Sequence, residues 1–374
     1  MLELFGNLLN LQWQQVVMWA IGGLLIWLAI AKDMEPTLLL PIGFGAILVN
    51  IPMSGAVTHM VDGVMEIGVL DTLFNMGIAN ELFPLLLFIG IGAMIDFGPL
   101  FMQPKMIFLG AAAQFGIFAT LSLAALFGFE MRDAAAIASI GTADGPVAIV
   151  IANYFNTQYL GTIVVVAYSY MALVPIVQPP IVKALTTKKE RLIRMDYDQK
   201  DIPKTLRILF PIAVTLITGL IAPKAIALVG FLMFGNLIRE CGVLNMLSQS
   251  AQKELPNLIT LVLGITVAVR MQAEHFLTVE MFMILGLGLV AFALDTAGGI
   301  FFAKILNLFS KNKINPMVGA AGISAFPMSA RVIHKMGLKE DPNNFLLMQA
   351  ISANVAGQIA SVIAGGLIIS LVVL

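Results

Sequence analysis

One carboxylate stands inside an apolar stretch that cannot form a continuous helix. Asp144 is the only charged residue of Ser139–Ile149, and Gly141 and Pro146 interrupt the backbone hydrogen bonds on either side of it. Such a break leaves carbonyl groups free, and these together with a carboxylate provide the oxygen ligands that a hard cation such as Na⁺ takes. A turn-capping aspartate is the alternative interpretation, because Asp-Gly-Pro is a common turn sequence. We favour Asp144 as a sodium ligand.

A second apolar stretch, residues 315–331, is interrupted in the same way and also carries polar side chains. Both stretches have a glycine five residues before a proline. Broken backbone at membrane depth is tolerated only where it is buried in protein or lines a wet cavity. Two such breaks in corresponding places indicate the binding site of a transporter built from repeats. The interrupting residues are Pro316, Gly319, Gly322 and Pro327, and the polar residues are Asn315, Ser324 and Arg331.

Three side chains can add oxygen ligands to a cation bound at Asp144. Ser324 offers a hydroxyl and Asn315 an amide within the second broken stretch, while Asn354 offers an amide in the last apolar run. The alternative for Asn354 is a hydrogen bond between two helices. We expect Asp144, Asn315, Ser324 and Asn354 to form a sodium site.

The remaining polar residues of the apolar runs suggest other chemistry. Arg331 is the only fixed positive charge in the second broken stretch, and its planar fork suits a carboxylate or carbamate, although it can also snorkel to the interface. Tyr170 follows the first break and can relay a proton, although a packing tyrosine is the usual case. Asp96, Arg270 and Asp295 also lie in apolar surroundings and receive no role.

The composition is that of a membrane protein. Of 374 residues, 59% are hydrophobic and only 11% charged, which predicts a polytopic membrane protein. The net charge of -1 offers no basic patch for nucleic acid. Cys241 is the only cysteine, and His59, His275 and His334 lack metal-ligand spacing, so disulfides and thiolate clusters are excluded. No basic residue precedes Lys32, so we expect the first apolar run to be a retained span.

The fold class predicted is an all-α polytopic protein made of two repeats. The first repeat is 1–185 with a re-entrant hairpin at about 133–154, and the second is 208–374 with a hairpin at about 315–333, joined by a polar linker, 186–207. Residues 55–80 and 240–256 are expected as interfacial helices. Ten expected spans fall near 16–31, 37–53, 81–98, 105–128, 158–185, 208–222, 223–238, 257–272, 279–309 and 343–373.

Charge placement predicts the topology. If the N-terminus is outside, most Lys and Arg residues, including those of the linker, fall on the cytoplasmic side, as the positive-inside bias requires. The exceptions are Arg132 and Lys224 outside, with Arg270 and Arg331 in apolar segments. The two repeats then have opposite orientations, and their hairpins enter from opposite sides to meet near the midplane.

Long motifs resemble a known family, the β subunits of sodium-pumping biotin-dependent decarboxylases. That family includes the oxaloacetate, methylmalonyl-CoA and glutaconyl-CoA decarboxylase pumps. The resemblance covers nearly the whole chain. The matching motifs are residues 92–100 (GAMIDFGPL), 143–146 (ADGP), 167–175 (AYSYMALVP), 178–181 (QPPI), 311–316 (KNKINP), 330–331 (AR) and 354–357 (NVAG).

The resemblance implies a reaction and a set of site residues. Carboxybiotin on a separate carrier is decarboxylated at this membrane subunit, one proton is consumed, and Na⁺ leaves the cell. Asp144 is then the essential acid, with Tyr170, Ser324 and Arg331 as further catalytic residues. Arg331 and Gly319 would bind carboxybiotin. Asn315 and Asn354 match the pattern beside them.

The resemblance also implies partners and a location. The cofactors are Na⁺ and a biotin attached to another subunit. The partners are a carboxyltransferase α subunit, a biotin carrier and a small membrane-anchored γ or δ subunit, with a homo-oligomer expected. The location is the prokaryotic cytoplasmic membrane.

Two other classes of function remain open from the residues. A sodium-coupled carboxylate symporter or sodium/proton antiporter uses the same kind of fold. A structural membrane anchor is the other, although it gives no reason for Asp144 or the paired breaks. The organic acid and the ion stoichiometry are not encoded in any pattern found.

Overall fold

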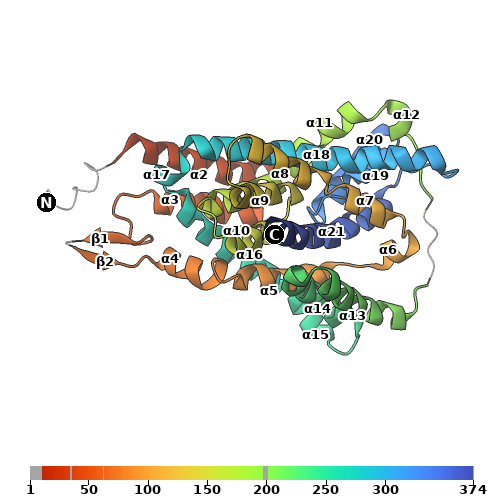
Figure 1. Cartoon of the computed structure of the whole chain (residues 1–374), viewed down its shortest axis with the longest axis horizontal. Coiled ribbons are helices and arrows are strands. Elements are labelled where there is room, and N and C mark those ends of the chain that lie inside the picture. Colours follow the sequence, from red (N-terminus) through yellow and green to blue (C-terminus); the bar gives the residue numbers. More distant parts are fainter. Residues whose placement is uncertain (1–10, 34–35, 62, 197–200, 374) are drawn as a thin grey trace.

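The computed structural model describes residues 11–33, 36–61, 63–196 and 201–373, and Figure 1 shows that they form mainly helices. By length and composition, seven helical segments of this part of the chain can cross a membrane. A bent pair, Val69–Ile78 and Leu82–Met94, with 58° between its parts, is an eighth candidate. The all-α polytopic class is therefore confirmed. The seven are Trp13–Lys32, Met106–Leu126, Leu160–Leu185, Lys204–Ile221, Asn245–Met271, Val279–Phe309 and Leu347–Val372.

The first half of the chain contains the first broken segment. Its break is a short 3₁₀ turn, η3 (Ser139–Thr142), between α9 (Met131–Ala138) and α10 (Gly145–Tyr154), and the long α11 (Leu160–Leu185) follows. The helices before it are α2 (Trp13–Lys32), α3 (Pro36–Val49), α4 (Val69–Leu73), the π-helix η2 (Phe74–Ile78), α5 (Leu82–Met94), α6 (Gly98–Met102), α7 (Met106–Ala112) and α8 (Phe115–Leu126).

The second half repeats this order of helix, break, helix and long helix. The short α19 (Pro316–Ala320) and α20 (Met328–Glu340) flank the second break, and the long α21 (Leu347–Val373) follows. The division into two repeats and their inversion both stay predictions. The other elements are α12 (Lys188–Arg191), α13 (Lys204–Ile221), η4 (Pro223–Ala225), α14 (Ile226–Glu240), α15 (Asn245–Gln252), α16 (Glu254–Val267), η5 (Ala268–Met271), α17 (Ala273–Phe276) and α18 (Val279–Phe309).

The predicted number of ten spans also stays a prediction, because three of the ten apolar runs form short helices. Those runs give α3 with 14 residues, α5 with 13 and α14 with 15. A helix needs about 20 residues to cross the hydrocarbon core without distortion of helix or bilayer. Near 105–128, a single apolar run divides into α7 and α8.

The segment 55–80 is not the interfacial helix expected, because its first part is a β-hairpin. β1 (His59–Val61) pairs antiparallel with β2 (Val64–Glu66), and Gly63 has the positive φ of 78° that a tight turn needs. The carboxylate of Asp71 in α4 accepts a hydrogen bond from the Thr58 N–H at 2.6 Å and ties the hairpin to the helix. The periodicity of so short a segment did not distinguish strand from helix.

Close backbone contacts at glycines hold the helices together. A methyl group on Gly22 would lie 2.6 Å from the Gly43 carbonyl oxygen, and one on Gly299 would lie 2.0 Å from that of Gly319. The first contact joins α2 to α3, and the second joins α18 to α19. Small residues at such contacts are how helices pack in a membrane, where no hydrophobic effect drives them together.

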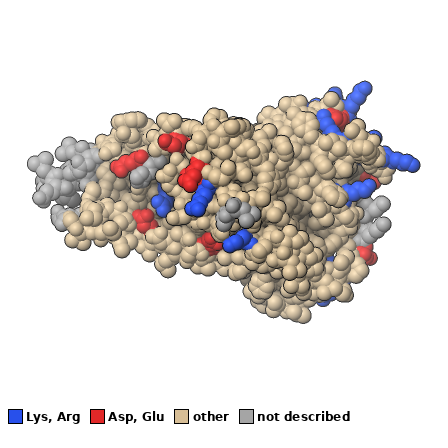
Figure 2. Space-filling model, viewed as in Figure 1, with Lys and Arg blue, Asp and Glu red and all other residues tan. Residues whose placement is uncertain are grey.

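Basic residues gather at one end of the molecule. Figure 2 shows several Lys and Arg side chains at the end that carries α12 and the linker. Three ion pairs fasten the linker to α18 and α20 there: Arg191–Glu340 at 2.7 Å, Arg194–Asp341 at 2.7 Å and Lys304–Glu190 at 3.1 Å. We call this end the linker end.

Candidate functional site

The two broken segments are in direct contact. The backbone N–H of Ser324 in the second break donates to the Thr142 carbonyl oxygen in the first at 3.2 Å. Ala143 then takes a left-handed conformation with φ 51°, and Asp144 is extended with φ -128° and ψ 97° before α10 begins at Gly145. The chain therefore turns sharply at Asp144, and the side chain lies where the two breaks meet.

The carboxylate of Asp144 is enclosed by protein. Its residue is 3% exposed, and Gln358 Nε2 donates a hydrogen bond to its Oδ2. Gln358 lies on α21, one helical turn after Asn354, so both side chains face the breaks. Sequence reasoning missed Gln358 as a site residue, although its i,i+4 spacing from Asn354 was a usable signal.

The second break is held by α21 and α11. The Ser324 hydroxyl donates to the Gly357 carbonyl oxygen at 3.2 Å, and Asn354 Nδ2 donates to the Ile323 carbonyl oxygen at 2.6 Å. Gln178 Nε2 of α11 donates to the Ala320 carbonyl oxygen at 2.8 Å. The bonds to Ile323 and Ala320 pair backbone carbonyls of the break itself, as buried backbone requires.

Several buried oxygen atoms around the breaks have no hydrogen-bond partner in the described part of the chain, and Asn354 Oδ1 and Tyr168 Oη are two of them. Tyr168 is 1% exposed, and a methyl group on Gly145 would lie 2.3 Å from its Cζ, the carbon that carries the hydroxyl. Its hydroxyl end therefore packs against the residue after Asp144. A buried oxygen without a hydrogen-bond partner destabilises the folded state unless a ligand or ion binds to it.

Tyr170 points elsewhere, although the sequence favoured it over Tyr168. Its hydroxyl donates to the Leu285 carbonyl oxygen on α18 at 2.6 Å. Residues two apart on a helix face different sides, so only one of these tyrosines can face Asp144. The motif carries both tyrosines, and only the packing of α11 distinguishes them.

Asn315 and Gly319 hold the backbone of α19 in place. Asn315 Oδ1 caps α19 by accepting from the Met317 N–H at 3.0 Å, and its Nδ2 donates to the carbonyl oxygens of Arg191 and Ile193. Gly319 allows the close contact with Gly299 of α18. The structure thus brings Asp144, Ser324 and Asn354 together and engages Asn315 at the linker end. A ligand role for Asn315 or Gly319 stays a prediction.

Arg331 lies exposed on α20, and no carboxylate among the described residues forms an ion pair with it. Asp96, in contrast, belongs to a charge network, 3.5 Å from Arg207 and 3.7 Å from Arg239. The guanidinium carbon of Arg270 lies 4.5 Å from the centre of the Phe74 ring. Neither Arg331 nor Arg270 forms an ion pair with a described residue, and Arg331 is the one that lies beside the second break.

Two polar cavities are lined by segments that lie at opposite ends of the long axis, as the positions of those segments in Figure 1 show. The one at the linker end measures about 520 Å³ and is lined by Lys105, Arg194 and Lys313 with the carboxylate of Asp196. The one at the β-hairpin end measures about 540 Å³, and its charged lining residues are Arg270, Asp71, Glu274 and Glu280. The first cavity is net positive and the second net negative.

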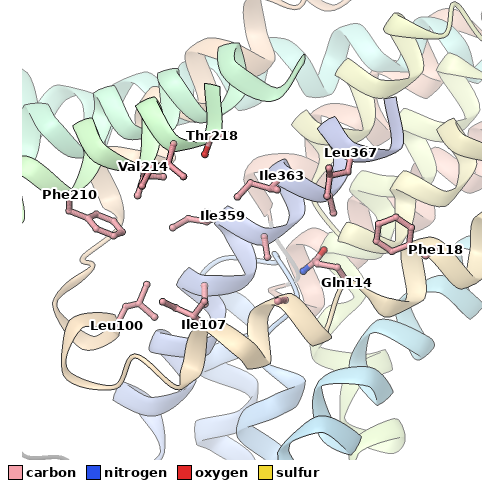
Figure 3. A pocket seen from close by; sticks show the side chains of 15 residues that line it. Leu100, Ile107, Gln114, Phe118, Phe210, Val214, Thr218, Ile359, Ile363 and Leu367 are labelled. Carbon is pink, nitrogen blue, oxygen red and sulfur yellow. The ribbon is translucent and has the colours of Figure 1, made fainter. Parts of the chain in front are cut away.

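A third cavity, of about 420 Å³, is apolar. Figure 3 shows Phe210 and Val214 of α13 facing Ile359 and Leu367 of α21 across it, with Gln114 at one side. Its hydrocarbon lining offers almost no ligand to an ion, so it does not belong to the cation site.

Comparison with known proteins gives one consistent result. The family model for the Na⁺-transporting oxaloacetate decarboxylase beta subunit matches residues 14–372. The chain is 43% identical to oxaloacetate decarboxylase beta chain 2 of Salmonella typhi, over 98% of this chain and 97% of that one. It is 47% identical to the methylmalonyl-CoA decarboxylase subunit beta of Propionigenium modestum (95% and 94%). It is 45% identical to the glutaconyl-CoA decarboxylase subunit beta of Acidaminococcus fermentans (96% and 94%).

Proposed function

The chain belongs to the family of Na⁺-transporting oxaloacetate decarboxylase β subunits, and we propose that it is the membrane subunit in which decarboxylation of a carrier-bound carboxybiotin drives Na⁺ export. Relatives named for three different acids share this subunit, which supports assigning it the step common to all three. The acid itself is then selected by another subunit. The observation that carries the proposal is the buried carboxylate of Asp144 at the contact of the two breaks.

We assign the sodium ion to the space beside Asp144. The Asp144 carboxylate supplies the negative charge, and the unpaired oxygens Asn354 Oδ1 and Tyr168 Oη supply neutral ligands. The Ser324 hydroxyl adds a further oxygen next to them. Hard cations select such sets of carboxylate, amide, hydroxyl and carbonyl oxygens. Tyr168 is thus an added ligand, whereas the sequence proposed Tyr170 as a proton relay, and the Tyr170 hydroxyl donates to Leu285 instead.

The two charged cavities suit the two mouths of a sodium pathway. If the linker end is cytoplasmic, the positive cavity there attracts an anionic carboxybiotin, and the exposed Arg331 can hold its carboxylate through two parallel hydrogen bonds. At the opposite end, the carboxylates of Asp71, Glu274 and Glu280 would attract a Na⁺ ion that leaves the protein there. Movement of one helix bundle against the other would open the site to each mouth in turn.

Coupling follows from competition at Asp144. The carboxylate holds Na⁺ when it is ionised and cannot hold it when it is protonated. Decarboxylation of carboxybiotin consumes one proton, which is supplied by the protein or by water. We propose the partners that the resemblance implies, namely a carboxyltransferase α subunit, a biotin carrier and a small γ or δ membrane subunit, with several copies of this chain in one prokaryotic cytoplasmic membrane complex.

The test replaces Asp144 with asparagine, which keeps the size and one oxygen ligand but removes the charge. The purified membrane complex is assayed for Na⁺-stimulated decarboxylation of free carboxybiotin and, in sealed vesicles, for uptake of radioactive Na⁺. Both activities should be lost together. Asp33→Asn is the matched control, because Asp33 is exposed and its left-handed conformation, with φ 53°, suits asparagine equally well.

An Asp144→Asn complex that still pumps Na⁺ would refute the site assignment. A symporter or antiporter makes a different prediction: vesicles would take up Na⁺ in response to a carboxylate or proton gradient when no carboxybiotin is added.

A further inference from the structure

A second buried acid borders the same broken segment from α18. Asp295 is 1% exposed, and its Oδ1 accepts a hydrogen bond from the Ile117 backbone N–H at 3.2 Å. A methyl group on Gly141, three residues before Asp144, would lie 2.8 Å from its Oδ2. Asp295 therefore lies against η3, whose last residue, Thr142, accepts a hydrogen bond from Ser324 of the second break.

One oxygen of Asp295 has a structural role. Helix α7 ends at Ala112 and α8 starts at Phe115, so the first N–H groups of α8 lack partners within their own helix. Oδ1 caps this new helix start from outside, and Gly116 makes room for it, because a methyl group there would lie 2.5 Å from Oδ1. The capping role accounts for Oδ1 only.

The other oxygen, Oδ2, is buried and has no hydrogen-bond partner in the described ranges. No charged residue lies on α7, α8, η3 or α19, which pack against α18. Apart from Asp295 itself, the charged and titratable side chains of this packing lie on α9 and α11, which also contact α18, and on α18. They are Arg132 and Asp133 on α9, Tyr168, Tyr170 and Lys183 on α11, and Glu280 and Lys304 on α18.

None of these groups neutralises Asp295. Arg132, Lys183 and Glu280 are exposed, whereas Asp295 is fully enclosed. Lys304 pairs with Glu190, and Asp133 accepts from the Thr157 hydroxyl. An ionised carboxylate in this position would be a buried charge without a counter-charge, which costs several kcal/mol.

We propose that Asp295 is a proton-binding site coupled to the sodium site: its Oδ2 carries a proton while Asp144 is ionised and empty, and it releases that proton when Na⁺ binds at Asp144. A proton needs a single oxygen, whereas Na⁺ needs several, and Oδ2 lies beside Gly141, a residue with no side-chain oxygen to offer. This inference rests on the proposed function. It adds a second titrating acid to the site.

The coupling is electrostatic. Two carboxylates that border the same short segment, Asp144 at its end and Asp295 from α18, cannot both be ionised cheaply, so the charge on empty Asp144 keeps Asp295 protonated. Na⁺ at Asp144 cancels that charge, and the O–H bond of Asp295 then breaks to leave a carboxylate and a free proton. The released proton replaces the one that decarboxylation consumes, and Asp295 regains a proton from water after Na⁺ has left. Na⁺ binding and proton supply are thereby linked.

Infrared difference spectroscopy of the purified complex tests the proposal. A protonated aspartic acid gives a carbonyl stretching band that is absent from a carboxylate, and labelling with ¹³C-aspartate shifts it away from the bands of glutamic acids. Wild type without Na⁺ should show this band, and adding Na⁺ should reduce it, whereas the same concentration of choline should not. Asp295→Asn, which keeps an Oδ1 cap for Ile117, should abolish the band.

Asp144→Asn separates this inference from the proposed function. In Asp144→Asn the band should be weak even without Na⁺, because the negative charge that keeps Asp295 protonated is absent, and it should no longer respond to Na⁺. This second variant keeps the coupling testable if Asp295→Asn does not fold, because a band of undiminished strength in Asp144→Asn would contradict it. Absence of the band from the wild type, or a band that Na⁺ leaves unchanged, would overturn the proposal, while loss of pumping in Asp144→Asn would still support the sodium site.

Discussion

Gly357 is the point at which α21 touches the second break, and adding one methyl group there should weaken Na⁺ binding. The methyl carbon of Gly357→Ala would lie 2.0 Å from the Gly322 carbonyl oxygen, whereas ordinary contact begins at 3.4 Å. The two segments would therefore have to separate by the difference, about 1.4 Å, if neither bends. The bond from Ser324 Oγ to the Gly357 carbonyl oxygen, now 3.2 Å, would then be lost.

The size of the effect follows from the cost of overpacking. Inserting a methyl group into a closely packed contact costs roughly 1–3 kcal/mol. If this free energy is lost entirely from Na⁺ binding, the Na⁺ concentration for half-maximal decarboxylation should rise about 5- to 140-fold. The assay is the Na⁺ dependence of carboxybiotin decarboxylation by the purified complex.

The matched control is Gly286→Ala on α18. Gly286 is exposed, and a methyl group there would meet no atom within 4 Å. Both substitutions favour the helix by about 1 kcal/mol. The two variants therefore differ only in whether the added methyl group meets another atom. Gly286→Ala should keep the wild-type Na⁺ dependence. Wild-type behaviour of Gly357→Ala would show that the close contact does not shape the cation site.

Four further predictions concern the site and the topology. Tyr168→Phe should raise the half-saturating Na⁺ concentration more than Tyr170→Phe, and the reverse order in the same assay would exclude Tyr168 as a ligand. Arg331→Lys keeps the charge but loses the bidentate fork, so decarboxylation should fall markedly at saturating Na⁺, and unchanged kinetics would mean that Arg331 only snorkels. Lowering the pH should raise the half-saturating Na⁺ concentration, because protons compete for Asp144, and Na⁺ titrations at several pH values that coincide would contradict this. A cysteine at Lys188→Cys should react with membrane-impermeant reagents only from the cytoplasmic side, and labelling from outside alone would overturn the topology.

Much of the candidate site was readable from the sequence because its signals are local. Apolar runs identify a membrane protein, and glycine and proline break a helix wherever it packs. The two breaks and Asp144 between Gly141 and Pro146 therefore follow from the residue order alone. The family resemblance rests on the same continuous motifs, and the family model confirmed it across residues 14–372.

What only the tertiary structure decided is the direction in which each polar side chain points. Tyr168 and Tyr170 stand in one motif, yet the packing of α11 turns the first toward Gly145 and the second toward Leu285. Asp295 received no role from its own stretch, because Gly141 and Ile117, which border it, are more than 150 residues away in the chain. A helix has a repeat but no fixed outside, so the side that becomes the site depends on which neighbours it packs against.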